Sequence, residues 1–101
     1  MNVYLDNAAT TAPYPEVLEA MKPYLTEFYG NPSSLHATGR KARAAIELAR
    51  KSIAKLIGAT SAEIIFTSGG TEADNIFLQG IAPSVPCIIS SPIEHPAVLN
   101  R

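Results

Sequence analysis

The chain has 101 residues, of which 47% are hydrophobic and 17% charged, and its formal net charge is -1. This composition is typical of a folded domain and excludes a disordered tail. The near-neutral charge, without a basic cluster, gives no reason to expect nucleic acid or an anionic membrane as a partner. No apolar run has the length of a membrane span, and the first residues lack the features of a signal peptide, so we expect a cytoplasmic protein. The single cysteine, Cys87, can form neither an internal disulfide nor a CxxC metal site, and no metal site is expected.

The first predicted elements are an extended segment and a helix. Residues 3–5 form a short apolar piece that ends at two turn residues, and residues 8–13 look extended. Residues 14–29 are predicted to be helical, because apolar residues recur there at three- and four-residue spacing: Val17, Leu18, Met21, Tyr24, Leu25 and Phe28. Pro23 lies inside this pattern and is expected to kink or split the helix.

A loop at residues 30–34 precedes the strongest predicted helix, residues 38–57. Thr38 is the predicted cap of this helix, and Gly58 is predicted to end it. Basic residues cover the side opposite to the apolar stripe. We interpret them as a solvated helix face rather than a nucleic-acid surface, because Glu47 interrupts them. The apolar stripe consists of Ala42, Ala45, Ile46, Ala49, Ile53 and Leu56.

The remainder of the chain alternates between predicted strands and helices. Residues 63–67 are apolar and β-branched and predict a buried strand, which a helix over residues 72–81 follows. After a loop, residues 87–90 predict a second short buried strand, and a further helix is predicted over residues 94–101. This order predicts α/β architecture with parallel strands.

The turn between the first predicted strand and its helix reads Ser68-Gly69-Gly70-Thr71. The first turn of a helix leaves backbone N–H groups without partners, and the helix dipole adds partial positive charge there. Two glycines allow an anion to approach the backbone closely, and Thr71 adds a hydroxyl donor. The turn therefore suits a phosphate group. The alternative is a purely structural turn. Because the Lys-Ser/Thr ending of a P-loop and the GxGxxG pattern of a dinucleotide site are both absent, a phosphate bound here would belong to another kind of ligand.

Four motifs in register carry a resemblance to a known family. They are YLDNAATT at 4–11, GNPSSLH at 30–36, SGGTEADN at 68–75 and SPIEHPAV at 91–98. Together they closely resemble the N-terminal part of cysteine desulfurases of the NifS/IscS-like group, which are pyridoxal phosphate (PLP) enzymes of aminotransferase class V. The resemblance covers essentially the whole chain, whereas the enzymes of the family are several times longer.

The resemblance implies the fold and the domain organisation. The chain would form the N-terminal portion of a fold type I large domain with an incomplete sheet. Residues 1–13 would be an extended segment on the small-domain side, and residues 14–101 would begin the truncated PLP-binding large domain. In the family, later strands lie between the first two strands of the sheet, so the two strands predicted here would lack neighbours.

The resemblance also implies roles for individual residues. Gly69, Gly70 and Thr71 match the turn that binds the PLP phosphate. His95 matches the histidine that stacks on the pyridine ring, where an imidazole can also exchange protons.

Further residues in the motifs have less specific roles. Asn7 and Asn31 lie in loops that are close to the active-site entrance in the family, although both residues could simply stabilise turns. The role of His36 stays open. Glu72 is expected to bond backbone or a neighbouring loop, since a carboxylate repels phosphate, and it receives no catalytic role.

The implied activity is removal of sulfur from L-cysteine, leaving L-alanine and an enzyme persulfide, with PLP as the electron sink. The implied use is iron–sulfur cluster assembly or other sulfur transfer, by a homodimer that serves a sulfur-acceptor or scaffold protein. The lysine that binds PLP and the sulfur-accepting cysteine lie further along the chain in the family, so these 101 residues alone are expected to be inactive. Cys87 lies in a predicted buried strand and is expected to be inert. The alternatives are another class V enzyme, such as a selenocysteine lyase or an aminotransferase, and a non-enzymatic phosphate-binding or interaction module.

Overall fold

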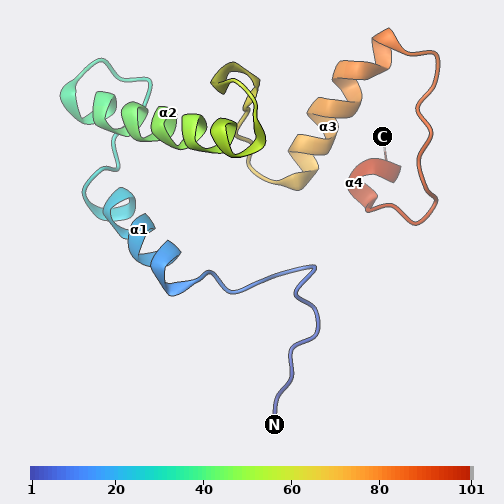
Figure 1. Cartoon of the computed structure of the whole chain (residues 1–101), viewed down its shortest axis with the longest axis horizontal. Coiled ribbons are helices and arrows are strands. Elements are labelled where there is room, and N and C mark those ends of the chain that lie inside the picture. The colour runs from blue at the N-terminus through green and yellow to red at the C-terminus, as the bar shows by residue number, and fades with distance from the viewer. Residues whose placement is uncertain (101) are drawn as a thin grey trace. The chain divides into compact units, whose positions relative to one another are not determined.

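The computed structural model describes residues 1–100, and this part of the chain consists of helices joined by loops. It divides into two compact units, of which the first is Met1–Glu63 and the second starts at Ile64. The first unit contains α1, α2 and η1, and the second contains α3, η2 and α4. In chain order (Figure 1), the elements are α1 (Pro15–Thr26), α2 (Ala37–Ile57), the 3-10 helix η1 (Ser61–Glu63), α3 (Gly70–Ile81), the 3-10 helix η2 (Ala82–Ser84) and α4 (Pro96–Leu99).

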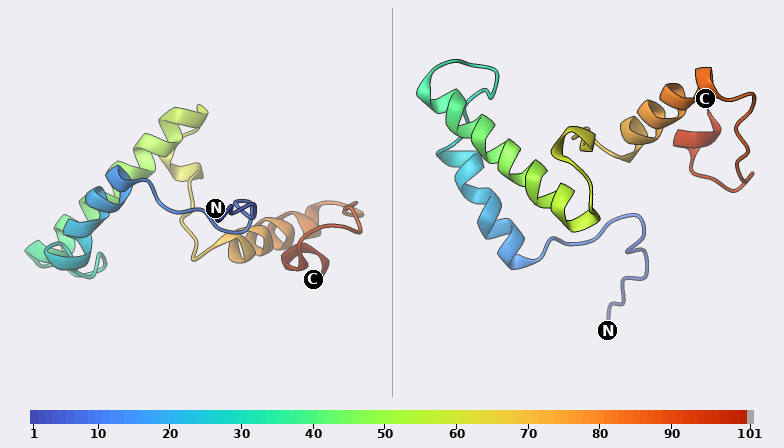
Figure 2. Two further views of the ribbon diagram at one scale, coloured as in Figure 1. Left: turned by 90° about the horizontal axis from the view of Figure 1, so that it is seen from below. Right: turned by 45° about the horizontal axis from the view of Figure 1, so that its top comes forward.

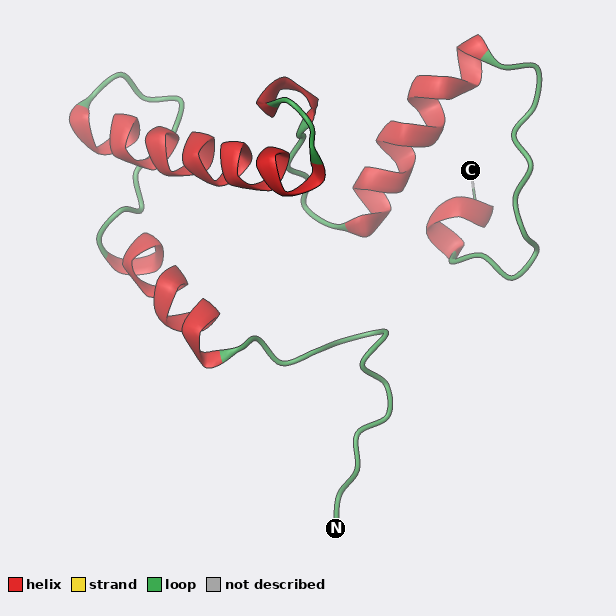
Figure 3. Cartoon of the chain, viewed as in Figure 1, coloured by secondary structure: helices red, strands yellow, loops and turns green. Residues whose placement is uncertain are grey.

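The predicted sheet is not present in residues 1–100. Residues 3–5, 64–67 and 87–90 form no strand and are drawn as loops in Figure 3. Glu63, the predicted first residue of a strand, instead ends η1. A strand needs a neighbouring strand to complete its ladder of backbone hydrogen bonds, and apolar β-branched sequence cannot supply that neighbour. The predicted α/β architecture is therefore not observed within this part of the chain.

The longest helix, α2, has distinct signals at both ends. His36 caps its N-terminus, because the backbone N–H of Gly39 donates to His36 Nδ1 at 3.2 Å. The prediction that Thr38 is the cap is wrong, since Thr38 already lies inside the helix. At the other end Gly58 adopts a left-handed conformation with φ 70°, and its N–H donates to the Ala54 carbonyl. The predicted end of the helix is confirmed.

Two glycines allow the loop before α2 to fold back against the start of that helix. A Cβ atom on Gly39 would lie 2.5 Å from the Ser34 carbonyl oxygen and 2.6 Å from that of Asn31. A Cβ atom on Gly30 would lie 2.6 Å from the Thr38 carbonyl oxygen. All of these neighbours are backbone atoms. The contacts therefore require glycine at both positions.

The first helix, α1, is shorter than predicted and passes through Pro23 as one helix. The split that was expected at Pro23 does not occur, because Pro23 lies close enough to the end that little helix follows it. The Pro23 carbonyl accepts the N–H groups of Glu27 and Phe28, both at 2.8 Å, and this ends the helix. Phe28 pairs with Tyr24 at a ring-centroid distance of 5.8 Å, and Lys41 Nζ of α2 lies 5.9 Å from the Phe28 ring. Figure 2 shows α1 beside α2 within this unit.

Few apolar side chains are buried in the described residues. The buried ones are small, namely Ala42, Ala54 and Ala97. The predicted apolar face of α1 is largely open, as the 70% exposure of Leu25 illustrates. The helices are thus defined mainly by their own capping and turn contacts, while their larger apolar residues remain accessible.

Two features are absent from residues 1–100. None of the helices there has the length and apolar character needed to cross a lipid bilayer. No group of three or more His, Cys, Asp and Glu side chains is arranged to hold a metal ion.

The glycine contacts at the start of α2 generate a matched pair of substitutions. Gly39→Ala should lower the free energy of unfolding by about 1–3 kcal/mol, because the new methyl group meets backbone oxygens that cannot move independently. Gly80→Ala should instead raise it by roughly 0.4–1 kcal/mol, because Gly80 is helical and a Cβ there meets nothing within 4 Å. Thermal unfolding followed by circular dichroism measures both. Equal effects of the two variants would contradict the packing that we describe around Gly39.

Candidate cofactor site

The start of α3 is an open helix N-terminus. Gly69 is its cap residue, is nearly fully extended at φ 169° and ψ -179°, and supplies no side-chain acceptor. The first backbone bond of the helix runs from the Ala73 N–H to the Gly69 carbonyl at 3.1 Å. The N–H groups of Gly70, Thr71 and Glu72 precede this bond and have no intrahelical acceptor. The predicted arrangement of a glycine turn at a helix start is confirmed, with the helix beginning two residues earlier than expected.

The space in front of this helix start is empty. A Cβ atom built on either Gly69 or Gly70 would meet no atom within 4 Å. Beside the turn lies an open hollow of about 590 Å³, lined by Ser68, Thr71, Glu72, Asn75 and Gln79. Polar side chains, among them the carboxylate of Glu72, therefore line an open volume beside the glycine turn.

Glu72 is held by Ser68 rather than by the first turn of its own helix. Its Oε2 accepts the Ser68 backbone N–H at 2.6 Å and the Ser68 hydroxyl at 2.8 Å. These two bonds, the backbone one first, lower the pKa of Glu72 from its ordinary value of 4.5. The expectation that Glu72 bonds backbone is confirmed. The carboxylate fixes the turn and leaves the N–H groups of the first turn available.

Asn75 lies one turn beyond Thr71 and was not singled out by the sequence analysis as a site residue. Its Nδ2 donates to the Thr71 carbonyl at 2.6 Å. Its Oδ1 is buried and has no hydrogen-bond partner among residues 1–100. The four-residue spacing from Thr71 to Asn75 is the signal that could have identified it, since side chains at this spacing reach back along a helix.

His95 is the N-cap of α4. The Ala97 N–H donates to His95 Nδ1 at 3.1 Å, and Pro96 occupies the first helical position. Because Nδ1 accepts this bond, the neutral ring carries its proton on Nε2. The ring is exposed, whereas Ala97 behind it is buried. The last predicted helix is shorter than expected, since α4 ends at Leu99, and Arg101 lies outside the described residues.

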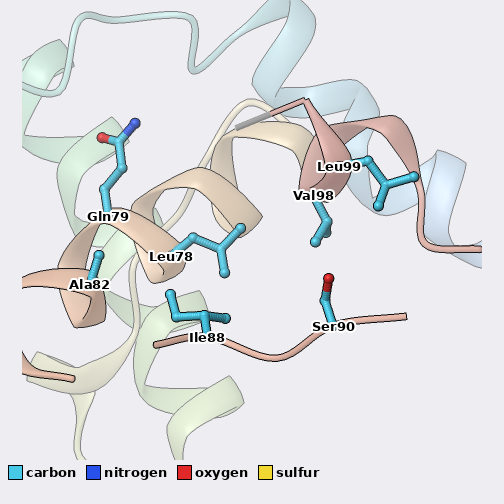
Figure 4. Close-up of a pocket in the computed structure, with 7 residues that line it drawn as sticks. All are labelled: Leu78, Gln79, Ala82, Ile88, Ser90, Val98 and Leu99. Carbon is cyan, nitrogen blue, oxygen red and sulfur yellow. The ribbon is translucent and has the colours of Figure 1, made fainter. Parts of the chain in front are cut away.

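A pocket of about 410 Å³ is lined by residues of α3, of α4 and of the segment between them. Figure 4 shows the side chains of Leu78 and Val98 pointing toward each other, with Ile88 and Ser90 along one side. Residues 87–90 therefore run along a pocket rather than within a sheet. Cys87 is exposed, so the expectation that it is buried is wrong, because within this unit nothing covers the segment.

The predicted site residues fall into both units. The turn Gly69–Thr71 and His95 belong to the second unit, where α3 and α4 pack together, although no hydrogen bond in residues 1–100 joins His95 to that turn. Asn7 and Asn31 belong to the first unit.

The polar residues of the first unit make local contacts. The Asn7 carbonyl accepts the Thr11 hydroxyl at 2.8 Å, and Asn31 Oδ1 accepts the Ser33 N–H at 2.9 Å. The Asn31 bond stabilises a turn through its side chain, which was the alternative interpretation of this residue, whereas Asn7 contributes only its backbone carbonyl. His36, whose role was open, caps α2.

Comparisons with known proteins agree on one family. Residues 3–101 match Aminotransferase class-V. The chain is 58% identical to "Cysteine desulfurase IscS" of Dictyoglomus turgidum, over 97% of this chain and 26% of that protein. It is 53% identical to "Cysteine desulfurase IscS" of Methanosarcina thermophila, over 97% of this chain and 25% of that protein. A solved structure named "NIFS-LIKE PROTEIN" aligns with a TM-score of 0.87 at 44% identity, over 99% of this chain and 28% of that one.

The share of each relative that the chain covers determines what these matches show. The chain spans about a quarter of the length of the curated relatives it matches. Its described fold is that of the corresponding part of an aminotransferase-type protein. Since the family match runs over all but the first two residues, the chain belongs to the aminotransferase class-V family.

Proposed function

We propose that this chain supplies the phosphate-binding turn of a PLP-dependent cysteine desulfurase. The observation that carries the proposal is the open start of α3, where three N–H groups lack an intrahelical acceptor, two glycines leave room for an approaching group, and Thr71 lines an open hollow. The relatives named cysteine desulfurase, at 50–58% identity, support the choice of reaction. The whole reaction would also need groups from the part of those proteins that this chain does not cover.

The residues at the start of α3 fit the phosphate of PLP. The glycines leave room for its oxygens, and the first-turn N–H groups and helix dipole favour its charge. Gly69, Gly70 and Thr71 would hold the phosphate. The carboxylate of Glu72 lines the same hollow as Thr71, but it binds Ser68 rather than the first-turn N–H groups.

His95 fits the ring of the cofactor. Its bond to the Ala97 N–H fixes the imidazole relative to α4 and occupies Nδ1, so an exposed flat face is available for stacking. Any proton that His95 exchanges would pass through Nε2, the nitrogen that α4 leaves unoccupied. When bound, PLP supplies the electron sink that the chemistry at the substrate needs.

The proposed reaction converts L-cysteine and an enzyme thiol into L-alanine and an enzyme persulfide. The carbon–sulfur bond of the substrate breaks, and a sulfur–sulfur bond forms on the enzyme. The proposal includes a cytoplasmic homodimer, a sulfur-acceptor or scaffold protein as partner, and a use in iron–sulfur cluster assembly. It also places residues 1–13 on the small-domain side, residues 14–101 in the large domain, and Asn7 and Asn31 in active-site loops. A cysteine-dependent sulfide assay with and without PLP, on the full-length protein, tests the reaction.

Two substitutions at the turn test the phosphate site. Thr71→Ala should weaken PLP binding by about tenfold or more, because a hydrogen bond to a charged group contributes about 1.5–3 kcal/mol. Gly70→Val should abolish binding without unfolding the protein, because its side chain fills space that is otherwise empty. Equilibrium dialysis measures the affinity, and circular dichroism checks the fold. Unchanged affinity in both variants would contradict the phosphate assignment.

The lowered pKa of Glu72 predicts a pH dependence of the turn. A carboxyl whose pKa is lower in the folded protein contributes stability above its unfolded value, and this contribution disappears as the pH falls through the folded value. The Ser68 amide should therefore be protected from hydrogen exchange above pH 4.5 and lose protection below it. In the Glu72→Gln variant, this pH-dependent change in the protection of the Ser68 amide should vanish. The Thr60 amide donates to Glu63 in the same way, so in that variant it should keep its own pH-dependent change in protection.

Cys87 provides a negative test of the sulfur chemistry. In the family the sulfur-accepting cysteine lies far along the chain, so Cys87→Ser should leave cysteine-dependent sulfide release unchanged. Because Cys87 is exposed, its replacement by serine should not alter the melting temperature either. Loss of persulfide formation in a folded Cys87→Ser protein would place the acceptor at this residue instead.

A further inference from the structure

We propose that Asn75 is a positioning residue for the phosphate-binding turn, acting through the Thr71 carbonyl; this inference rests on the proposed function. Asn75 lines the hollow beside the turn, together with Ser68, Thr71 and Glu72. It lies about one turn beyond Thr71, and its Nδ2 donates to the Thr71 carbonyl at 2.6 Å. Its contact joins the body of α3 to the peptide group at which the anion would bind.

The geometry shows how this contact would act. The carbonyl of Thr71 and the N–H of Glu72 belong to one peptide group, so a donor on the carbonyl polarises that N–H. Hydrogen bonds linked in this way strengthen one another by about 10–30% per bond. The Glu72 N–H is one of the three first-turn groups without an intrahelical acceptor. Asn75 thereby both fixes the orientation of this donor and increases its strength toward phosphate.

The side-chain oxygen of Asn75, Oδ1, supports an indirect role. Oδ1 is buried and has no partner among residues 1–100, so the side chain is held rather than rotating in solvent. As an acceptor, Oδ1 would repel phosphate oxygens and cannot bind them itself. Because only the amide nitrogen can donate to a carbonyl, the bond from Nδ2 identifies which side-chain atom of Asn75 is nitrogen and which is oxygen. Asn75 is therefore suited to hold the turn and unsuited to touch the phosphate.

The test compares PLP with pyridoxal, which has the same ring but no phosphate. The full-length protein is freed of cofactor, and both affinities are measured by absorbance titration. Asn75→Ala should weaken PLP binding by up to about fivefold, because it removes the strengthening of one first-turn donor and not a bond to the ligand itself. Pyridoxal affinity should stay constant. A merely structural role would weaken both ligands together, so the ratio of the two affinities isolates the positioning effect.

Three further variants complete the design. Asn75→Ser should preserve the ratio, because a serine hydroxyl in a helix can donate to the same carbonyl. Gln79→Ala should change neither affinity, since Gln79 lines the same hollow one turn further on and points away from the apolar side chains around Leu78 (Figure 4). If Asn75→Ala does not fold, as judged by circular dichroism, Asn75→Leu replaces it, because it has nearly the same shape with neither the donor nor a charge.

The outcomes separate this inference from the proposed function. A wild-type protein that binds PLP no better than pyridoxal would overturn the phosphate site, and the role of Asn75 with it. A wild-type preference that persists fully in Asn75→Ala would overturn the role of Asn75 alone. The same holds if Asn75→Ser loses the preference to the same extent as Asn75→Ala. A reduced ratio in Asn75→Ala that serine restores establishes the positioning role.

Discussion

The N–H groups in the first turn of a helix need acceptors, and the described helices meet this need in different ways. Histidine rings cap α2 and α4, each through Nδ1, at the backbone N–H groups of Gly39 and Ala97. In α1, Pro15 at the first position removes one N–H altogether. Only α3 combines the absence of a side-chain cap with three intact N–H groups and empty space in front of them. Among the helices of residues 1–100, the candidate site is therefore the start that has three first-turn N–H groups and no side-chain acceptor for any of them.

Local sequence was a good guide wherever the structure depends on local contacts. Gly58 ends α2 because it adopts φ 70°, a conformation that glycine reaches without strain. The start of α3 and the position of Pro96 at the start of α4 also follow from turn chemistry. The strands predicted at residues 64–67 and 87–90 are not observed among residues 1–100, because strand formation depends on a neighbour elsewhere in the sequence. Hydrophobic pattern alone indicates that a segment could pair, but it does not provide the partner.

The site shows the same division between local and non-local information. Motif resemblance identified Gly69, Gly70, Thr71 and His95, and these residues form a helix start and a cap in the second unit. The capping roles of the two histidines could not be predicted, because histidine has no strong preference for cap positions. Asn75 was missed for a related reason, since asparagine inside a helix normally indicates little beyond low propensity. Its importance appears only when the bond to the Thr71 carbonyl and the buried Oδ1 are seen together.

The purely structural interpretation of the turn at residues 68–71 can be weighed by comparing its two glycines with the other glycines of the chain. Gly30 and Gly39 are required by backbone atoms that leave no room for a methyl group, and Gly58 by its positive φ. Neither reason applies to Gly69 and Gly70. Gly69 is extended, a conformation open to any residue, Gly70 is helical, and both face empty space.

A glycine that neither the backbone conformation nor the packing requires still lowers stability, because it has the most conformational freedom to lose on folding. Neither conformation nor packing requires glycine at Gly80 either, but Gly80 lies near the C-terminus of α3, where no first-turn N–H group is available. At the N-terminus the missing side chains leave donors accessible from outside the chain. A structural turn would not need two glycines there, whereas close approach of an anion to the backbone would.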